Sequence, residues 1–326
     1  MKTNFPIIHS LRGLTAIGIC LYHYVCCTIN YVQPGKVFDI FYLLSNTVQV
    51  FFIISGMVIP ISMIVSNYSL KHFFIFLWKR TLRIEPPYLA SIAVGIVYLF
   101  VRNYIPGSAP VNLLPSYKEL ILHLGYLIPF FPDTKWINNG YWTLAIEFQF
   151  YFVMAFIFPL ALSKKLFYRV LFYGALCAFT LLHPKDNMFS GWSTYFLLGI
   201  SYILFFFKKI NLKEYIVVSV VASIITFMTM SIINLSIAWG TIILVMLAKD
   251  WENKFTKFFG DRSYSFYLLH SIIGAPITNF LSHRYTISWQ KPIVISLGFI
   301  VSVIAAHYFF LFLEKPSMRW SKNVKY

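Results

Sequence analysis

Two ionisable residues in an apolar segment near the N-terminus have a spacing that could support chemistry. Arg12 and His23 stand eleven positions apart in the segment LRGLTAIGICLYHY. Eleven residues make close to three turns of a helix, so both side chains share one face and lie roughly 16 Å apart along its axis. A snorkelling Arg and a hydrogen-bonded core His would be the simpler arrangement. Inside a membrane, however, ionisable groups are costly, and they usually have a function.

A carboxylate in a second apolar segment, YWTLAIEFQFYF, could assist this histidine. Counting helix rise from each membrane face places Glu147 and His23 at a similar depth, in the outer half of the membrane. A carboxylate beside an imidazole would orient its tautomer and stabilise its charged form, as a general base requires. From spacing alone, a carboxylate bonded to a neighbouring helix or to water is equally compatible.

A pair of arginines in the segment SLKHFFIFLWKRTLRIEPPYL could bind phosphate. Arg80 and Arg83 share one face of a helix, and two guanidiniums suit a phosphate or pyrophosphate. Ordinary positive charge in contact with lipid headgroups is the alternative, and charge alone favours it. We expect residues 70–83 to form an interfacial amphipathic helix. The prolines at 86–87 should end that helix and hold Glu85 in an extended conformation.

Three further polar residues lie in apolar segments. Ser55, next to Gly56, permits close helix packing or leaves room for a thin ligand. His270 could pair with a polar neighbour or contact a ligand, and we expect Glu314 to form a structural ion pair. No metal-ligand spacing occurs, so we expect no metal site.

The elements that must position these residues are membrane helices. The chain has 326 residues, of which 59% are hydrophobic and only 12% charged. Long apolar runs recur along its whole length, which indicates an all-α integral membrane protein with about ten transmembrane helices and a single domain, 1–326. The expected spans are 7–29, 39–65, 87–102, 141–162, 166–183, 190–207, 214–233, 235–248, 263–281 and 292–313.

The positive charge predicts the orientation of these spans. The net charge is +16, but Lys and Arg stand in short clusters between apolar runs, a pattern typical of membrane topology rather than of nucleic-acid binding. With residues 118–131 as an outer re-entrant or interfacial segment, 20 of the 27 basic residues lie on the cytoplasmic side. Both termini are then cytoplasmic, and residues 103–140 lie outside.

Six segments together resemble the integral membrane acyltransferases that include bacterial O-antigen acetylases, acyltransferase family 3. They are LRGLTAIGICLYHY, FFIISGMVIP, KRTLRIEPPYL, YWTLAIEFQFY, SYSFYLLHS and EKPSMRW, and they span residues 11–320. The resemblance implies transfer of an acyl group, usually acetyl, from cytoplasmic acyl-CoA to a carbohydrate or lipid-linked glycan outside. No tightly bound cofactor is expected, and a bacterial inner membrane is the expected location.

The resemblance also assigns roles to residues. His23 and Glu147 match the family's catalytic histidine and carboxylate, whereas Arg12, Arg80 and Arg83 match its donor-binding arginines. Within the matching segments, the expected supporting residues are Ser55, Trp142, Tyr264, His270 and Glu314.

The sequence departs from the family's pattern at three positions. Thr143 replaces a usual Ser, Phe148 stands where a second acidic residue is common, and Glu85 stands where an aromatic residue is usual. These departures make the acceptor harder to infer. The esterase-like domain that some members carry is absent from this sequence, so a separate partner could complete the reaction.

A polytopic transporter or glycan exporter is the competing interpretation. It would use the same intramembrane Arg, His and Glu as a substrate or proton path. The sequence shows no internal repeat, which counts against a secondary transporter. Release of free thiol from acetyl-CoA would discriminate the two.

Overall fold

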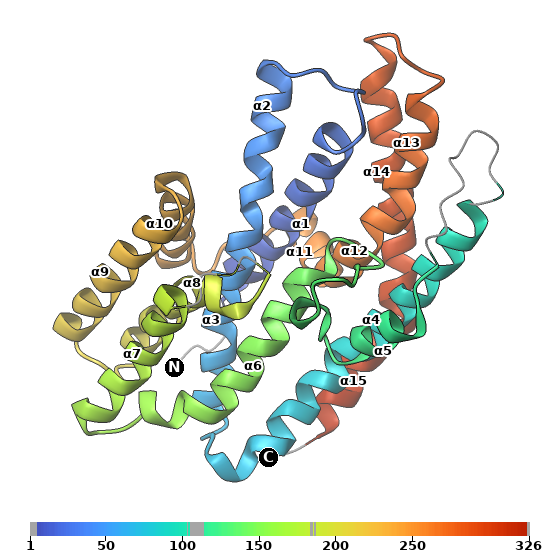
Figure 1. Ribbon diagram of the computed structural model, residues 1–326. Helices are drawn as coiled ribbons and strands as arrows, with labels where there is room; N and C mark the ends of the chain where they lie inside the picture. Colours follow the sequence, from blue (N-terminus) through green and yellow to red (C-terminus); the bar gives the residue numbers. More distant parts are fainter. Residues whose placement is uncertain (1–4, 103, 105–113, 183–184, 186, 325–326) are drawn as a thin grey trace.

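The computed structural model describes residues 5–102, 104, 114–182, 185 and 187–324 (Figure 1). Every regular element in these ranges is a helix, which confirms the predicted all-α class. Residues 103 and 105–113 of the predicted outer stretch, and residue 183 of a predicted span, lie outside the described residues.

The described part of the chain forms a series of α-helices. Their bounds are α1 Pro6–Cys26, α2 Lys36–Leu43, α3 Val48–Val65, α4 Phe73–Arg102, α5 Tyr117–Leu124, α6 Tyr141–Ala161, α7 Leu166–Leu182, α8 Phe189–Phe206, α9 Leu212–Thr229, α10 Ile232–Leu247, α11 Lys254–Asp261, α12 Ser263–Leu269, α13 Ala275–Ser282, α14 Gln290–Phe309 and α15 Lys315–Asn323. Short 3₁₀ turns are η1 Leu44–Thr47, η2 Leu70–His72 and η3 Ile128–Phe130, and π-helical turns are η4 His270–Gly274 and η5 Phe310–Glu314.

Six helices in the described part of the chain are long and apolar enough to cross a membrane. They are Lys36–Val65, Leu70–Arg102, Tyr141–Ala161, Phe189–Phe206, Leu212–Thr229 and Gln290–Asn323. The other predicted spans, 7–29, 166–183, 235–248 and 263–281, fall on helices that do not meet that measure. A count of ten spans and two cytoplasmic termini therefore stays a prediction.

The helix α4 runs unbroken through two prolines, so the predicted break at 86–87 was wrong. Glu85 is helical rather than extended, and residues 73–102 form one helix instead of an interfacial helix followed by a span. Proline removes a backbone donor and its ring crowds the carbonyl four residues earlier, but its φ is close to the helical value, so packing can hold a helix across it. Here Pro87 is buried, and the Tyr264 hydroxyl donates to the carbonyl of Ile84 at 2.8 Å.

The segment 118–131, which the charge pattern predicts to lie outside, falls on α5 and η3, both too short to span a membrane. Ser116 caps α5 by accepting from the Glu119 amide at 3.3 Å, while the Glu119 carboxylate accepts from the Ser116 amide at 2.8 Å. His123 is fully buried and joins this helix to the next loop. Its Nδ1 donates to the Glu119 carbonyl at 2.7 Å, and its Nε2 accepts from the Ile137 amide at 3.1 Å. His123 therefore links α5 to the loop that leads into α6.

Glycines bring α3 and α8 into close contact. A Cβ atom on Gly56 would lie 2.4 Å from the Phe196 carbonyl oxygen, and one on Gly199 would lie 2.4 Å from that of Ile53. The backbones therefore approach at positions where only glycine fits. This confirms the close helix packing that was predicted at Gly56.

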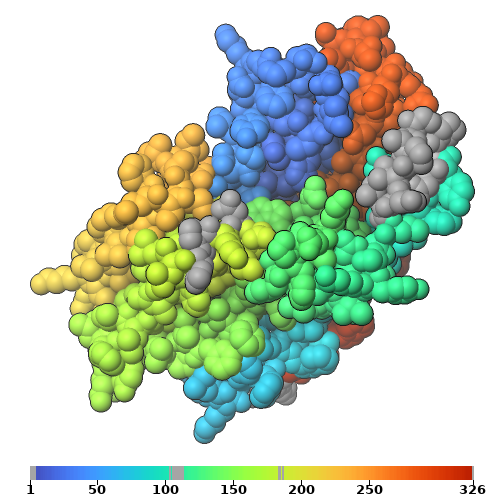
Figure 2. All heavy atoms as spheres, viewed as in Figure 1, coloured from blue at the N-terminus to red at the C-terminus, as the bar shows by residue number. Residues whose placement is uncertain are grey.

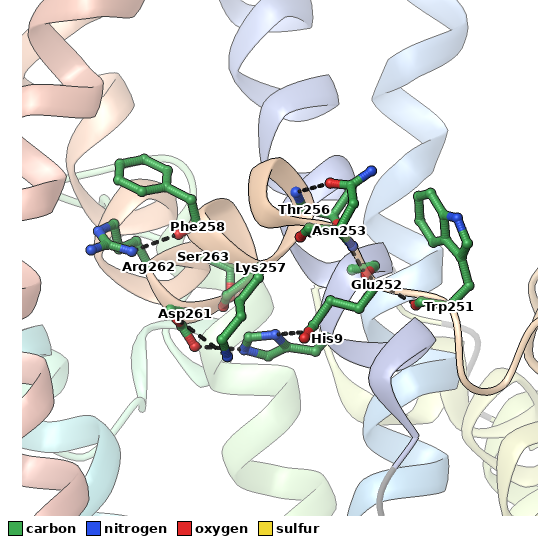
Figure 3. A network of polar contacts seen from close by, with 12 residues as sticks. His9, Trp251, Glu252, Asn253, Thr256, Lys257, Phe258, Asp261, Arg262 and Ser263 are labelled. Atoms are coloured by element: carbon green, nitrogen blue, oxygen red, sulfur yellow. Dashed lines mark hydrogen bonds and ion pairs between the residues drawn. The ribbon is translucent and has the colours of Figure 1, made fainter.

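The short helix α11 holds the first turn of α1. Figure 3 shows His9 between two carboxylates, with Nδ1 2.9 Å from Glu252 and Nε2 3.2 Å from Asp261. A Cβ on Gly13 would lie 2.6 Å from the Gly260 amide nitrogen, so the two helices also touch through their backbones. This contact fixes the start of α1, one turn before Arg12.

The ends of the helices gather at two opposite ends of the molecule. The turn between α3 and α4, the α6–α7 connection and the C-terminus lie at the lower end of the view (Figure 1). The α1–α2 connection and the α13–α14 hairpin form the protruding upper end, while α9 and α10 project to one side (Figure 2).

Candidate active site

Two histidines from distant parts of the chain form the centre of the site. Nδ1 of His23 in α1 lies 2.9 Å from Nε2 of His270 in η4, and the rings stack with centroids 5.0 Å apart. His270 is fully buried and His23 is half-buried. Of the two roles expected for His270, the structure therefore shows pairing with a polar neighbour.

The hydrogen bonds assign the tautomers of this pair. Nδ1 of His270 lies 3.1 Å from the Phe266 carbonyl, which can only accept, so that nitrogen carries the proton. In a neutral His270, Nε2 then accepts, and the proton in the contact belongs to Nδ1 of His23. The lone pair of His23 is consequently on Nε2, which is available to accept a proton from a substrate.

A π-helical turn holds His270 in place. Turns of this kind are frequent at functional sites, and His270 is the first residue of η4. The Tyr24 hydroxyl donates to the His270 carbonyl at 2.8 Å and lies 2.6 Å from the Ser302 hydroxyl of α14. Because Tyr24 has one proton and a carbonyl cannot donate, Ser302 is the donor in the second contact. Three helices therefore hold the histidine pair.

A cavity of about 620 Å³ opens beside His23, and we call it the outer cavity. Its size falls within the range of roughly 300–1,000 Å³ usual for ligand sites. Polar side chains line it: Asn138, Asn139, Ser271 and Asn279. Amide and hydroxyl groups of this kind hydrogen-bond sugar hydroxyls as donors and as acceptors.

The predicted pairing of Glu147 with His23 was wrong. The Glu147 carboxylate accepts from the Ser55 hydroxyl at 3.1 Å and from the Tyr151 hydroxyl, and it lines a different cavity. The depth estimate failed because the loop before α6 enters the bundle. The side-chain amide of Asn138 donates from Nδ2 to the Leu268 carbonyl at 3.2 Å and accepts at Oδ1 from the Ser271 hydroxyl at 2.9 Å.

Helix α6 therefore begins beside the histidine pair instead of at the outer surface. The Tyr267 hydroxyl, three residues before His270, donates to the Gly140 carbonyl at 3.0 Å, directly before the first residue of α6. Glu147 follows Gly140 by about two helical turns, or roughly 10 Å at 1.5 Å per residue. That rise carries the carboxylate past His23 toward the level of Arg12.

A second cavity, which we call the inner cavity, gathers most of the predicted polar residues. It measures about 60 Å³. Its charged lining residues are Arg12, Arg80, Arg83, Glu147 and Glu314, and its polar lining residues include Ser55, Tyr151 and Tyr264. Three cations against two carboxylates leave an excess of positive charge, which suits an anionic ligand.

The carboxylates of the inner cavity are hydrogen-bonded to hydroxyl groups. Glu314 accepts from the Ser265 hydroxyl at 2.5 Å and from the Ser265 amide at 3.0 Å, instead of forming the predicted close ion pair. Arg12 lies within electrostatic reach of Glu147 and Glu314. In the described part of the chain, however, neither Arg12 nor Arg83 donates a hydrogen bond from its side chain. Such donors are costly to leave unsatisfied, so an anion here would gain strong contacts.

Arg80 is held by aromatic rings. Its guanidinium donates to the Ser62 hydroxyl at 3.0 Å and lies over the rings of Phe76 and Tyr151, at 5.3 Å and 5.7 Å. Tyr151 was not predicted as a site residue. Its spacing of four from Glu147 was the available signal, because residues at i and i+4 meet on one helix face.

Trp142 lies in neither cavity. Its ring centroid is 6.0 Å from that of Trp192 and 6.3 Å from that of Phe52, so it belongs to the aromatic packing between helices. The predicted site residues therefore fall into a histidine pair at the outer cavity and an arginine cluster at the inner cavity.

Comparisons with known proteins indicate the family of the chain. A family model described as an acyltransferase domain matches residues 5–311. Proteins of Staphylococcus aureus strains COL, MSSA476 and MRSA252, whose names describe them provisionally as O-acetyltransferases, are each 24% identical over 361 residues. The match covers 95% of this chain and 57% of each relative, so the chain spans little more than half their length. No solved structure matches the chain.

Proposed function

The chain belongs to the acyltransferase-domain family, and we infer that it transfers an acyl group from acyl-CoA to a hydroxyl of a carbohydrate or cell-surface glycan. The observation that carries this proposal is the contact of His23 Nδ1 with His270 Nε2, which assigns the lone pair of His23 to Nε2, at the edge of the outer cavity that His23 lines. The names of the Staphylococcus relatives favour acetyl as the acyl group.

The inner cavity supplies the donor site in this proposal. The phosphates of acyl-CoA would contact Arg12, Arg80 and Arg83, whose fork-shaped guanidiniums match phosphate geometry. Arg12 and His23 share the helix α1, so an acyl arm held at the arginines has roughly 16 Å to cross. Because the inner cavity holds only about 60 Å³, donor binding requires the surrounding helices to move.

The chemistry follows from the tautomers. His23 Nε2 accepts the proton of the sugar hydroxyl while the sugar oxygen attacks the thioester carbonyl. The tetrahedral intermediate then breaks its carbon–sulfur bond, and the leaving thiolate receives the proton back from His23. Throughout, the Nδ1–H of His23 points at His270, which holds the ring in one orientation. The products are an ester and free CoA, so no further reactant is needed.

The setting of the reaction completes the proposal. Apolar helices and family membership place the protein in a membrane, and we propose the cell membrane of a bacterium, with donor inside and acceptor outside. The reaction as written needs no tightly bound cofactor. A separate esterase-like partner could act on the acceptor.

Thiol release tests the reaction. Purified protein is incubated with acetyl-CoA and an oligosaccharide acceptor, and free CoA is measured. We expect acceptor-dependent release that falls by roughly 10²–10⁴-fold in His23→Ala, the usual contribution of a general base. His283→Ala is the matched control, since His283 is exposed and lines neither cavity. Wild-type turnover in His23→Ala, or no release with any acceptor, contradicts the proposal; the latter favours an exporter.

The donor site is tested in the same preparation. Arg83→Ala should weaken acetyl-CoA binding in calorimetry about tenfold or more, because a lost charge-assisted contact costs about 1.5–3 kcal/mol. Arg83→Lys should restore part of the affinity, since the charge returns without the fork. His23→Ala should bind acetyl-CoA normally. If Arg83→Ala does so too, the arginines are not the donor site.

A further inference from the structure

Two cations with no role in the transfer chemistry line the outer cavity. Arg102 ends α4, and Lys135 lies in the loop before α6, yet both border the same cavity as His23. In the described part of the chain neither side chain forms a hydrogen bond or an ion pair. Both charges are therefore available to a ligand of this cavity.

The Glu119 carboxylate of the same cavity offsets only one of these two charges. Oε2 of Glu119 accepts from the amide and hydroxyl of Ser116, at 2.8 Å and 2.9 Å, while Oε1 accepts from the Lys135 backbone amide at 2.9 Å. The Ser116 and Lys135 backbone amides hold the pKa of Glu119 below its ordinary value, so it remains a saturated acceptor. With His23 neutral, the two cations and the one carboxylate of the lining leave one positive charge in excess.

The wall that carries Lys135 is held in place before any ligand arrives. Glu119 binds the amide of Lys135, and the buried His123 binds the amide of Ile137 at 3.1 Å. Asn138 is held from the other side by Leu268 and Ser271. Trp136 also lines the cavity, with its ring edge against His123 at a centroid distance of 5.4 Å. A fixed aromatic and cationic wall in the same cavity as a base is suited to recognition.

We propose that the acceptor sugar carries an acidic group, a carboxylate or a phosphate, which Arg102 and Lys135 hold while a hydroxyl of the same molecule reaches His23. This inference rests on the proposed function and narrows its substrate to anionic glycans. The position of Arg102 in the last turn of a helix also favours a cation on its own. That preference does not explain why Lys135, from a separate segment, meets the same cavity.

Three sugars that differ only at carbon 6 test the proposal. The full-length protein is reconstituted in neutral-lipid nanodiscs with acetyl-CoA and methyl glucoside, methyl glucuronide or methyl glucoside 6-phosphate, and CoA release gives kcat/KM for each. We expect at least one acidic sugar to exceed the neutral one by about tenfold, the effect of one charge-assisted contact. The two acidic sugars distinguish carboxylate from phosphate.

Variants that remove the charge of Arg102 or Lys135 test whether these side chains cause the preference for acidic sugars. Arg102→Gln and Lys135→Gln should each lower the ratio of kcat/KM for acidic over neutral sugar by about tenfold. Arg284→Gln is the control, because Arg284 is an exposed arginine just beyond the end of α13 and does not line the cavity. Equal use of all three sugars, or a preference unchanged in both variants, overturns the inference.

A binding measurement separates this inference from the proposed reaction. Saturation-transfer NMR reports binding of the same sugars without turnover. Selective binding of an acidic sugar that is lost in Arg102→Gln supports the inference even if no CoA is released, in which case only the acyl transfer fails. Transfer to all three sugars without selectivity leaves the proposed function standing and removes the inference.

Discussion

A neutral imidazole is an unusual partner for a general base, and its consequences differ from those of a carboxylate. His270 accepts from Nδ1 of His23 and so fixes the tautomer, but it adds no negative charge that would stabilise an imidazolium. The base therefore stays weak enough to return its proton to a leaving thiolate. The partner acts through orientation, which makes His270 a positioning residue.

The first prediction concerns this acceptor. His270→Gln places an amide oxygen near the former Nε2 and can still accept from His23, whereas His270→Ala cannot. We expect His270→Ala to lower kcat about tenfold or more and His270→Gln to retain most of it, with little change in the KM for acetyl-CoA. The measurement is steady-state CoA release, with the pH dependence of kcat recorded for both variants. Equal losses in the two variants would show that the ring is needed only for packing.

Among individual residues, spacing along the sequence identified the side chains that carry chemistry but not the residues that they contact. Seven of the predicted site residues meet at the inner cavity, and both histidines meet at the outer one. The partner of His23 was assigned wrongly because depth was counted from the first residue of the predicted span. The loop at Asn138 and Gly140 enters the bundle through contacts with α12 and η4, which no local pattern reveals.

Among the elements, irregular helical turns occur next to the candidate site. His270 begins the π-helical turn η4, and Glu314 ends the π-helical turn η5. The two prolines lie inside α4, between Arg83 and the outer cavity. Hydropathy predicted these helices, but tertiary contacts such as that of Tyr264 with Ile84 decide whether a proline breaks one. The residue ranges of the helices could therefore be predicted better than whether a helix continues through a proline.

The close contact of α3 with α8 gives a prediction for stability. Gly56→Ala should destabilise the protein by about 1–3 kcal/mol, because the added methyl would meet the Phe196 backbone, which cannot move aside. Gly174→Ala in α7 is the matched control, since its added methyl meets no atom within 4 Å and alanine favours a helix. Thermal unfolding of the detergent-purified variants checks this. A midpoint for Gly56→Ala equal to that of Gly174→Ala would contradict the packing argument.

For the whole molecule, the basic residues divide between the two ends of the helix bundle. The α3–α4 turn with Lys71, the α6–α7 connection with Lys164 and Lys165, and the C-terminus lie at one end (Figure 1). The α13–α14 hairpin, which carries Arg284, lies at the other end with the α1–α2 connection. Positive charge favours the cytoplasmic side, so this arrangement is consistent with the predicted orientation, in which the outer cavity would lie away from the cytoplasm.

Cysteine labelling in intact cells decides this orientation. Cys27 is exposed at the end of α1 and lines the outer cavity, so an impermeant maleimide should label the native protein, and Cys27→Ser should abolish most of that labelling. In the Cys27→Ser background, Lys165→Cys should react only after permeabilisation, because the predicted cytoplasmic loop is then reached. Labelling of Lys165→Cys but not of Cys27 in intact cells would show that the bundle has the opposite orientation. The histidine pair would then face the cytoplasm, and an acceptor outside the cell could not reach it.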